Sequence, residues 1–305
     1  MPVIDVCDLV KDYPGKRAVD GLSFHVEQGE VYGLLGENGA GKSTAIEILE
    51  GHRARTSGEV SVLGEDPGNA SRSLRDRIGI VLQSSGIETQ LTVREVVRLY
   101  GDCYRHRMAV EECIELVGLS ESADKRVELL SGGQKRRLDL ALGIVGHPEL
   151  LFLDEPTTGF DPAARRNSWE LIRTLCAGGT TVVLTSHYLD EVEHLADRVG
   201  VIVRGRLVVE GTPDSLTARS GVTTIRFQIP EGMTGDDVTG LVGHGALVDA
   251  GTVELTTETP TATLHSITSW ALGRGIELSG LTVSRPSLED MFLQVTASEN
   301  DVAVP

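Results

Sequence analysis

A glycine-rich run at residues 36–44, Gly-Glu-Asn-Gly-Ala-Gly-Lys-Ser-Thr, has the spacing of a phosphate-binding loop. Glycines let the backbone wrap closely, so that successive amides point at phosphate oxygens, and a following helix adds its positive N-terminal end. In such a loop Lys42 reaches the β- and γ-phosphates, and the Ser43 hydroxyl is a ligand for Mg²⁺. The residues expected to bind nucleotide are Gly36, Asn38, Gly39, Ala40, Gly41, Lys42, Ser43 and Thr44. The alternative is a simple glycine-rich turn, which the strand pattern before the run and the helical pattern after it disfavour.

Two carboxylates follow a second apolar run, at residues 150–153. Asp154 and Glu155 stand where an open α/β sheet places its functional groups, at the C-terminal end of a strand. We expect Asp154 to hold Mg²⁺ through water, and Glu155 to orient and deprotonate an attacking water. The alternative is an ordinary acidic turn, which is the weaker interpretation in a chain that also has a phosphate loop. Together the two motifs predict hydrolysis of a nucleoside triphosphate.

The run Leu-Ser-Gly-Gly-Gln at residues 130–134 opens a helical stretch between these two motifs. It resembles the signature sequence of ABC ATPases, and the resemblance extends, motif by motif, over residues 1 to about 215. A serine and a glycine at a helix N-terminus form an anion site, so Ser131 and the Gly133 amide are expected to cap a γ-phosphate. Gln134 belongs to the same expected nucleotide-binding set. The basic residues 135–137 that follow are expected to form a solvated face rather than a site.

Four further positions match elements of this family. Gln83 resembles the Q-loop glutamine, whose amide oxygen binds Mg²⁺, and His187 resembles the switch histidine that bonds the γ-phosphate. Asp161 matches the D-loop aspartate, and Tyr13 matches the aromatic residue that stacks on adenine. Each of these four residues could instead have a purely structural role. Gln83 could be a surface residue and His187 a structural histidine, while Tyr13 could serve local packing and Asp161 could cap the next helix.

The resemblance also implies a site shared between subunits. In this family the signature of one subunit caps the phosphate bound by the other, so ATP joins two subunits and hydrolysis releases them. The chain has one phosphate loop and one signature and therefore needs a second copy. The resemblance assigns catalysis to Lys42, Gln83, Glu155 and His187, and Mg²⁺ binding to Ser43, Gln83 and Asp154. The implied ligands are thus ATP and Mg²⁺.

Strand and helix patterns around the motifs predict an α/β core. Apolar runs typical of buried parallel strands lie at 31–35, 78–82, 150–153 and 181–184. Alternating segments that predict antiparallel strands lie at 3–6, 22–26 and 59–63, with a turn at Pro14 and Gly15. Residues 92–146 are mostly helical in pattern and follow a short helix at 44–50. The expected fold is a P-loop NTPase (ABC ATPase) domain over residues 1–220, with a helical insertion and an antiparallel β subdomain.

The composition changes after about residue 220. Residues 221–305 contain three basic and eleven acidic residues and no lysine. Their patterns predict strands at 224–229, 246–249, 252–257 and 278–284, and helices at 235–242, 261–272 and 287–295. This β-α-β-β-α-β order predicts a small ferredoxin-like α+β domain over residues 221–305. It contains no convergent polar motif that would indicate a chemical function.

Net charge limits the possible partners. A net charge of −17 disfavours binding to nucleic acid and to anionic lipid headgroups, so any membrane attachment is expected to occur through a protein partner. No stretch approaches 18 consecutive apolar residues, and no secretory signal is expected at the start. The four cysteines form no Cys-x-x-Cys pair and are expected to be small apolar residues without zinc or a disulfide framework.

Three kinds of ABC protein are considered for this ATPase domain, and features of the sequence disfavour two of them. A chromosome or DNA-repair ATPase needs a long coiled coil or zinc hook that this chain lacks. A non-transport ABC ATPase of translation or another cytoplasmic assembly usually has two ATPase halves and binds RNA. The C-terminal residues 285–293 instead resemble the daunorubicin-resistance type of drug-export ATPases. This implies efflux of a drug, antibiotic or lipid-like molecule through a separate permease at the cytoplasmic face of the cell membrane. The segment 287–295 is also compatible with a packed amphipathic helix.

Overall fold

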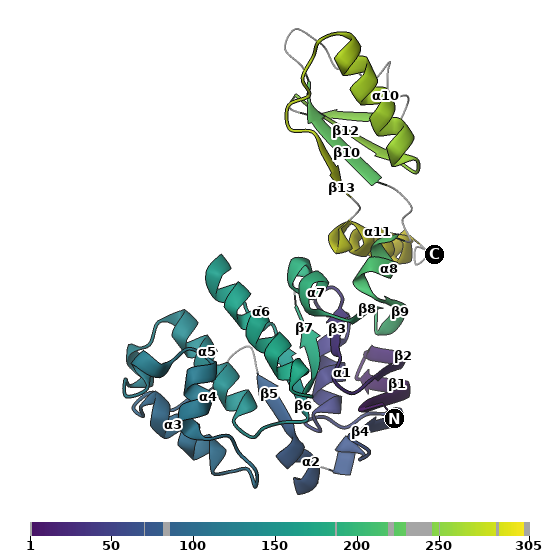
Figure 1. The fold of residues 1–305 in the computed structure, drawn as a ribbon. Helices are drawn as coiled ribbons and strands as arrows, with labels where there is room; N and C mark the ends of the chain where they lie inside the picture. The colour runs from purple at the N-terminus through teal and green to yellow at the C-terminus, as the bar shows by residue number, and fades with distance from the viewer. Residues whose placement is uncertain are drawn as a thin grey trace. The chain divides into compact units, whose positions relative to one another are not determined.

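The computed structural model of the chain describes residues 2–69, 71–81, 86–186, 188–218, 223–229, 246–249, 251–284 and 287–301. Gln83, His187 and the helix expected at 235–242 lie outside these residues. The chain divides into two compact units, Met1–Pro213 and Asp214–Pro305 (Figure 1). The domain limits 1–220 and 221–305 stay a prediction.

A six-stranded sheet with the order β5-β6-β7-β3-β8-β9 organises the first unit. Its strands are β3 Val31–Leu35, β5 Ile78–Val81, β6 Leu150–Asp154, β7 Thr181–Thr185, β8 Arg198–Val203 and β9 Arg206–Gly211. The first five are parallel, and only β9 runs antiparallel to its neighbour β8. All four predicted parallel strands are therefore confirmed. Every residue of β3 is buried, which explains why this strand is a continuous apolar run in the sequence.

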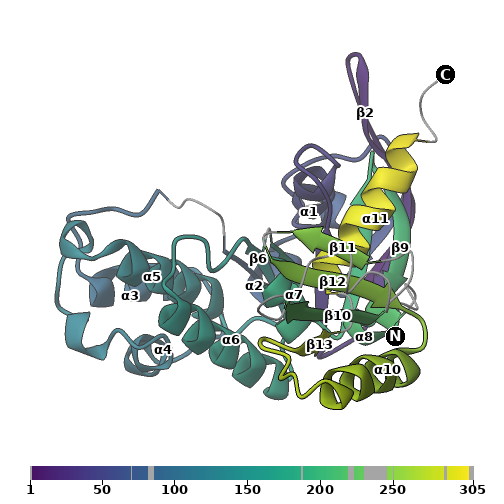
Figure 2. The ribbon, with the colours of Figure 1, turned by 90° about the horizontal axis from the view of Figure 1, so that it is seen from above.

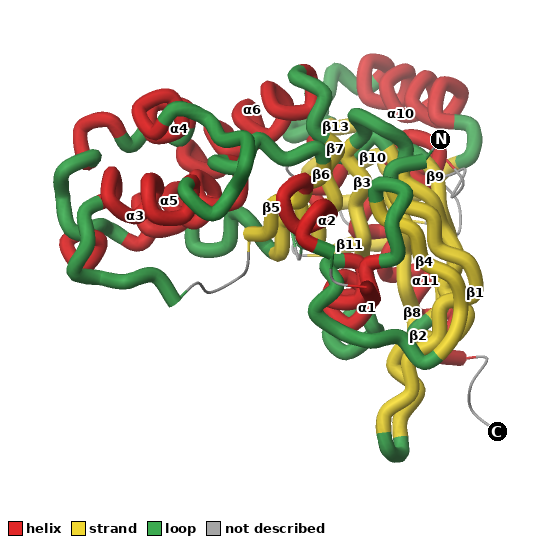
Figure 3. The backbone as a smooth tube through the Cα atoms, turned by 90° about the horizontal axis from the view of Figure 1, so that it is seen from below, coloured by secondary structure: helices red, strands yellow, loops and turns green. Residues whose placement is uncertain are grey.

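A second, antiparallel sheet has the order β2-β1-β4. Its strands are β1 Ile4–Tyr13, β2 Lys16–Val26 and β4 Ser57–Val62. The predicted turn at Pro14 and Gly15 is confirmed, but the two strands that it joins are longer than the alternating segments predicted. Register shifts within the β1–β2 pair interrupt the alternation of apolar and polar residues, so the pattern identifies only part of each strand. Figure 3 shows the end of this hairpin extending away from the rest of the unit.

Helix α1 (Lys42–Leu49) shares one apolar core with both sheets. The core includes Ile4 and Leu22 from the antiparallel sheet, Ile48 from the helix, and Tyr32 and Phe152 from the parallel sheet. All but Phe152 and Ile48, which are 1% exposed, have no exposed surface. Complete burial of such a side chain contributes roughly 1.5–3 kcal/mol to folding. This core therefore holds the start of α1 firmly against the C-terminal end of β3.

Other helices of the first unit lie around the parallel sheet. Helices α3 (Val93–Gly101), α4 (Val110–Leu116) and α5 (Gly132–Ile144) form the predicted helical insertion to one side of it (Figure 3). Gly33 of β3 faces Val192 of α7 (Leu189–Leu195), so α7 covers the sheet face opposite α1. Two more helices are α2 (Arg72–Arg77) and α6 (Pro162–Ala177), and short 3₁₀ turns occupy Pro67–Asn69, Ser120–Ser122 and Val127–Leu129.

The second unit contains an antiparallel sheet with the order β11-β12-β10-β13 (Figure 2). Its elements are α8 Pro213–Ala218, β10 Thr223–Gln228, β11 Ala246–Asp249, β12 Thr252–Thr257, α10 Pro260–Gly273, β13 Thr282–Ser284 and α11 Leu288–Asp301. Strand β12 separates the parallel strands β10 and β11, and β10 separates β12 from β13, as in a split βαβ arrangement. Ile225, Phe227 and Ile267 form its core, with Trp270 of α10 packed against them. Because residues 235–242 are not described, the complete ferredoxin-like arrangement stays a prediction.

Of the cysteines, Cys113 is buried and Cys176 is partly buried, whereas Cys7 and Cys103 are exposed. On α11, Leu288 and Met291 are buried, which agrees with a packed amphipathic helix. In the part of the chain that the structure describes, no helix has both the length and the apolar character needed to cross a bilayer.

The C-terminal end of α1 has a carboxyl group whose burial affects stability. Glu50 caps this helix, and its side chain is only 3% exposed. Burial, reinforced by the charges of Asp154 and Glu47, raises the pKa of Glu50 from 4.5 to about 8. Because the folded state favours the neutral carboxyl, the contribution of Glu50 to stability decreases as the pH rises from about 4.5 to about 8.

We therefore expect Glu50→Gln to be more stable than the wild type by about 1–3 kcal/mol near pH 8.5, and to match it below about pH 4.5. Urea unfolding at several pH values measures this difference. Glu59→Gln removes the same charge at an exposed position of β4 and should not change the pH dependence. Equal pH dependence in the wild type and Glu50→Gln would contradict the assignment.

Candidate functional site

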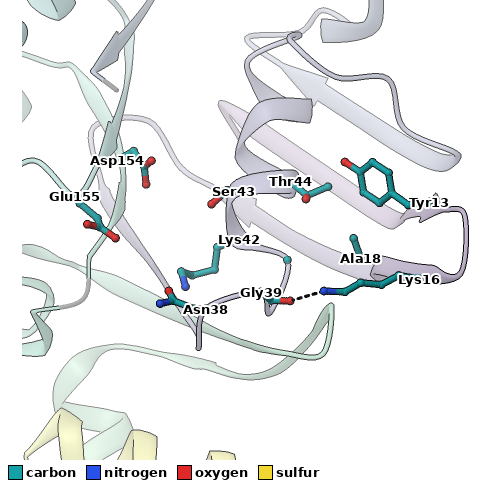
Figure 4. Close-up of a pocket in the computed structure, with 11 residues that line it drawn as sticks. Tyr13, Lys16, Ala18, Asn38, Gly39, Lys42, Ser43, Thr44, Asp154 and Glu155 are labelled. Carbon is teal, nitrogen blue, oxygen red and sulfur yellow. Dashed lines mark hydrogen bonds between the residues drawn. The ribbon is translucent and has the colours of Figure 1, made fainter. Parts of the chain in front are cut away.

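A pocket of about 460 Å³ lies where the phosphate loop meets the C-terminal ends of the parallel strands (Figure 4). Its lining residues are Tyr13, Lys16, Ala18, Asn38, Gly39, Gly41, Lys42, Ser43, Thr44, Asp154 and Glu155. Strand β7 lies between β3 and β6 in the sheet, and all three are parallel. The loop after β3 and the two carboxylates after β6 therefore reach the same edge of the sheet. Figure 4 shows Lys42 and Ser43 on one side of the pocket and the two carboxylates across from them.

Lys42 is held inside the phosphate loop itself. It is 8% exposed, and its Nζ donates hydrogen bonds to the carbonyl oxygens of Gly36 and Glu37, the latter at 3.0 Å. Burial lowers the pKa of Lys42, while the charges of Glu155 and Asp154 act in the opposite direction. The ammonium group is thus fixed at the centre of the loop, where it faces anything that enters the pocket.

Gly41 determines how the loop enters α1. Its φ is 110°, in the left-handed region that favours glycine, and a Cβ atom there would lie 2.3 Å from the Ala18 carbonyl oxygen. This residue is the N-cap of α1, and no acidic residue lies in the first turn of that helix. The positive helix end is therefore open toward the pocket, which suits an anionic ligand.

Glu155 lies in a backbone turn that needs support. Its φ is 49°, a conformation that costs a non-glycine residue about 1–3 kcal/mol. Its backbone NH donates to the Thr185 carbonyl at 2.9 Å, and its carboxylate accepts a bond from the Thr158 hydroxyl at 3.3 Å. The neighbouring Asp154 carboxylate accepts a bond from the Thr185 hydroxyl at 2.5 Å. These contacts direct both carboxylates to the pocket.

Arg136 corrects the expectation that the basic residues 135–137 form a solvated face. Its side chain is 8% exposed, and burial lowers its pKa. Its Nε donates to the Pro156 carbonyl at 2.9 Å, and its Nη2 donates to the carbonyls of Asp154 and Glu155 at 2.8 and 2.7 Å. The guanidinium therefore binds the backbone of the acidic turn directly. A basic residue in an amphipathic helical pattern gives no sign of this, because the acceptors are carbonyls distant in sequence.

Glu191 is a second residue that the sequence reasoning missed. This carboxyl group of α7 has no exposed surface, and burial raises its pKa. It accepts hydrogen bonds from the hydroxyls of Thr157 and Ser186 at 2.8 and 2.5 Å, and from Trp169 Nε1 at 3.1 Å. It thereby ties the segment after Glu155 to the segment after β7. A single acidic residue in a helix has no sequence pattern that predicts this burial.

Tyr13 and Lys16 reach the pocket from the β1–β2 hairpin. The Tyr13 ring has two cations near it, Lys11 Nζ at 5.2 Å and the Arg53 guanidinium carbon at 5.5 Å from its centroid. Lys16 Nζ donates to the Gly39 carbonyl at 3.5 Å, which Figure 4 marks. The hairpin thus brings an aromatic ring and positive charge to the rim of the phosphate loop.

The signature residues lie at a helix N-terminus, as predicted, but do not line this pocket. Ser131 is the N-cap of α5, where its hydroxyl accepts a bond from the Gln134 NH at 3.2 Å, and Gln134 Oε1 accepts the Ser131 NH at 3.0 Å. An added Cβ at Gly133 would meet no atom within 4 Å, so the space beside it is open. Asp161 is the N-cap of α6 and accepts bonds from the amides of residues 163 and 164, which lowers its pKa.

The sequence of the chain is similar to those of known families and proteins. A family model described as ABC transporter matches residues 19–158, and one described as an ABC transporter domain-containing protein-like, C-terminal domain matches residues 223–287. Daunorubicin resistance ATP-binding protein DrrA3 of Streptomyces coeruleorubidus is 37% identical over 300 residues, covering 96% of this chain and 95% of that protein. Nod factor export ATP-binding protein I of Burkholderia lata is 38% identical over 314 residues, covering 98% and 99%.

A solved structure agrees with these relatives. Clostridium perfringens cbiO1, part of the ABC transporter complex cbiONQ, superimposes with a TM-score of 0.64 at 29% identity, covering 72% of this chain and 92% of that one. The chain belongs to the ABC transporter family. Within that family it is an ATP-binding subunit that hydrolyses ATP, similar to the daunorubicin resistance ATP-binding proteins.

The conformation of Gly41 gives a direct test of the pocket. We expect Gly41→Ala to weaken ATP binding at least about tenfold, because the methyl group would strain the backbone and strike the Ala18 carbonyl. Isothermal titration calorimetry with ATP measures the change. Gly64→Ala is the matched control, since Gly64 also has a positive φ of 80° but no atom within 4 Å of an added Cβ. Unaltered ATP affinity in Gly41→Ala would show that this loop does not bind the phosphates.

Proposed function

We propose that this chain is the ATPase of an exporter, and that it works as an ATP-bound pair to drive a drug, antibiotic or lipid-like molecule through a separate permease. The observation that supports this most is that the phosphate loop faces Asp154 and Glu155 in one pocket. The N-terminus of the signature helix α5 belongs to the same unit but does not line this pocket. Among the residues that the structure describes around this pocket, the signature residues are not present, which supports a cap for the γ-phosphate that comes from a second copy.

ATP binding in this proposal uses the residues that line the pocket. The loop amides and Lys42 hold the β- and γ-phosphates, and Tyr13 stacks on adenine. The Ser43 hydroxyl and the Asp154 carboxylate are oxygen donors in the same pocket, as Mg²⁺ requires, and Gln83 is a further proposed ligand outside the described residues. Mg²⁺, when bound, would neutralise charge on the phosphate oxygens.

In ATP hydrolysis, Glu155 is proposed to act as the proton acceptor. Its carboxylate accepts a proton from water as the water oxygen forms a bond to the γ-phosphorus. The bond from that phosphorus to the bridging oxygen breaks, and ADP and phosphate result. Lys42 stabilises the charge that develops on the phosphate oxygens, and His187 is proposed to hydrogen-bond the γ-phosphate. Thr158 and the backbone contacts of Glu155 keep the carboxylate in the position that this transfer needs.

Pairing follows from the position of the signature. Ser131, Gly133 and Gln134 form an open helix N-terminus outside the pocket of their own chain, so we propose that they cap the γ-phosphate held by a second copy. Asp161, at the N-terminus of α6, is proposed to lie at the same interface. ATP then contributes contacts to both chains, and its hydrolysis removes those contacts.

Export through a permease rests on the relatives and on charge. The relatives named above are a drug-resistance protein and a Nod factor export protein, which favours an exporter over a non-transport ABC ATPase of translation. A net charge of −17 opposes direct binding to anionic lipid or to nucleic acid. We therefore propose that the chain lies at the cytoplasmic face of the membrane, held there by its permease.

Glu155→Gln tests the chemistry and the pairing together. We expect this variant to bind ATP normally, to lose at least about 100-fold in kcat, and to form an ATP-dependent dimer, because the amide cannot accept the proton. Phosphate release and size-exclusion chromatography with ATP measure these effects. In cells that also produce the permease, the variant should abolish drug efflux.

Lys42→Ala provides the contrast, since it should lose ATP binding, turnover and the dimer together. A Glu155→Gln protein that stays monomeric with bound ATP would argue against the shared site. Full turnover in Glu155→Gln would remove the proton-accepting role.

A further inference from the structure

We propose that Arg136 is a positioning residue that joins the signature helix α5 to the turn presenting Glu155, so that the state of the signature determines the position of the proton-accepting carboxylate. The inference rests on the proposed role of Glu155 and extends it to a residue that does not line the pocket. Arg136 itself touches no reacting atom.

The first support is the set of bonds that Arg136 makes. Its guanidinium donates to three successive carbonyl oxygens, those of Asp154, Glu155 and Pro156, at 2.8, 2.7 and 2.9 Å. The Nε and Nη2 groups of one planar guanidinium thus hold three peptide groups in a fixed relative geometry, which a flexible ammonium group cannot do. The Arg136 side chain is 8% exposed, so water does not readily replace these hydrogen bonds.

The second support is the conformation of the turn. Glu155 has a φ of 49°, and its peptide groups are held from both sides. Thr185 of β7 accepts its NH, and Arg136 of α5 binds its carbonyl oxygen. The Thr158 NH also donates to the Glu155 carbonyl, at 3.3 Å, so loss of Arg136 would leave this carbonyl with the longer of its two bonds and the Glu155 peptide less firmly held. Displacement of a catalytic group by about 1 Å is enough to cost roughly 100-fold in rate.

The third support is the place of Arg136 in α5. The helix begins at Gly132, directly after its N-cap Ser131, so Arg136 lies about one turn, roughly 6 Å, along the same rigid element. Asp139, one turn further on, lies 3.8 Å from Arg136 Nη1 and orients the guanidinium. When Ser131 binds the phosphate held by a second copy, any shift of α5 also moves Arg136. The carbonyl groups of residues 154–156, which are bonded to Arg136, then move with it. Hydrolysis in one pocket therefore depends on occupancy of the other.

Conservative replacement separates this role from simple structural support. We expect Arg136→Lys to lower kcat about 10- to 100-fold in the full-length protein, with Kd for ATP and the unfolding midpoint close to those of the wild type. Arg136→Gln should lower kcat further. Arg166→Lys and Arg166→Gln, at an exposed position of α6, are the matched controls and should leave kcat unchanged.

Two outcomes would overturn the inference: a folded Arg136→Lys with wild-type kcat, or a loss of kcat that only follows a loss of ATP binding. If Arg136→Gln does not fold, the lysine variant decides. Loss of activity in Glu155→Gln alongside normal activity in Arg136→Lys would reject this inference and leave the proposed function intact. Normal activity in Glu155→Gln would instead reject the proposed function.

Coupling to the signature has its own measurement. Ser131→Ala and Arg136→Lys are combined, and the loss of kcat in the double variant is compared with the product of the single losses. If the signature acts on Glu155 through Arg136, the double variant should lose clearly less than that product. Losses that multiply would show that the two residues act independently, and would overturn the link.

Discussion

Parallel pairing of β3, β7 and β6 is the constraint on which the rest of the site depends. It brings the loop after β3 and the carboxylates after β6 to one edge of the sheet, although more than a hundred residues separate them in sequence. The shared core with α1 covers one face of these strands, and on the other face α7 covers β3 at Gly33 while α5 meets β6 at Leu151. A change in their register would move the phosphate-binding and proton-accepting groups apart, so the apolar core and the chemistry are maintained by the same contacts.

The helical insertion adds a second level of organisation. Its helix α5 has two functions at nearby positions, since its exposed N-terminus forms the signature and its buried Arg136 binds the acidic turn. The turn is strained at Glu155, and Arg136 and Thr185 stabilise it from opposite sides. Glu191 holds the next part of the same segment through Thr157. The carboxylate that we assign to catalysis is thus positioned by groups from α5, α7 and β7 as well as by Thr158 of its own loop.

The sequence predicts the parts of this design that are local. Residues 31–35 are a continuous apolar run because a buried parallel strand requires one, and the glycine spacing of residues 36–44 follows from close backbone approach to phosphate. The β1–β2 hairpin was predicted too short because its register shifts interrupt the alternation. The prediction that Arg136 lies in solvent is wrong, and no sequence pattern marks Glu191, because burial of a charged group depends on partners that only the tertiary fold supplies. Gln83 and His187 stay predictions.

The chain has two tryptophans, and they report on different regions. Trp169 donates to Glu191, which binds the segment after Glu155 and the segment after β7, and its ring lies 4.7 Å from that of His194. Trp270 belongs to the second unit, where Arg274 lies 5.2 Å from its ring centroid. Replacing Trp270 with phenylalanine therefore leaves Trp169, beside the catalytic segments, as the one tryptophan. The ATPase cycle then becomes visible by emission from a natural side chain, without an attached dye.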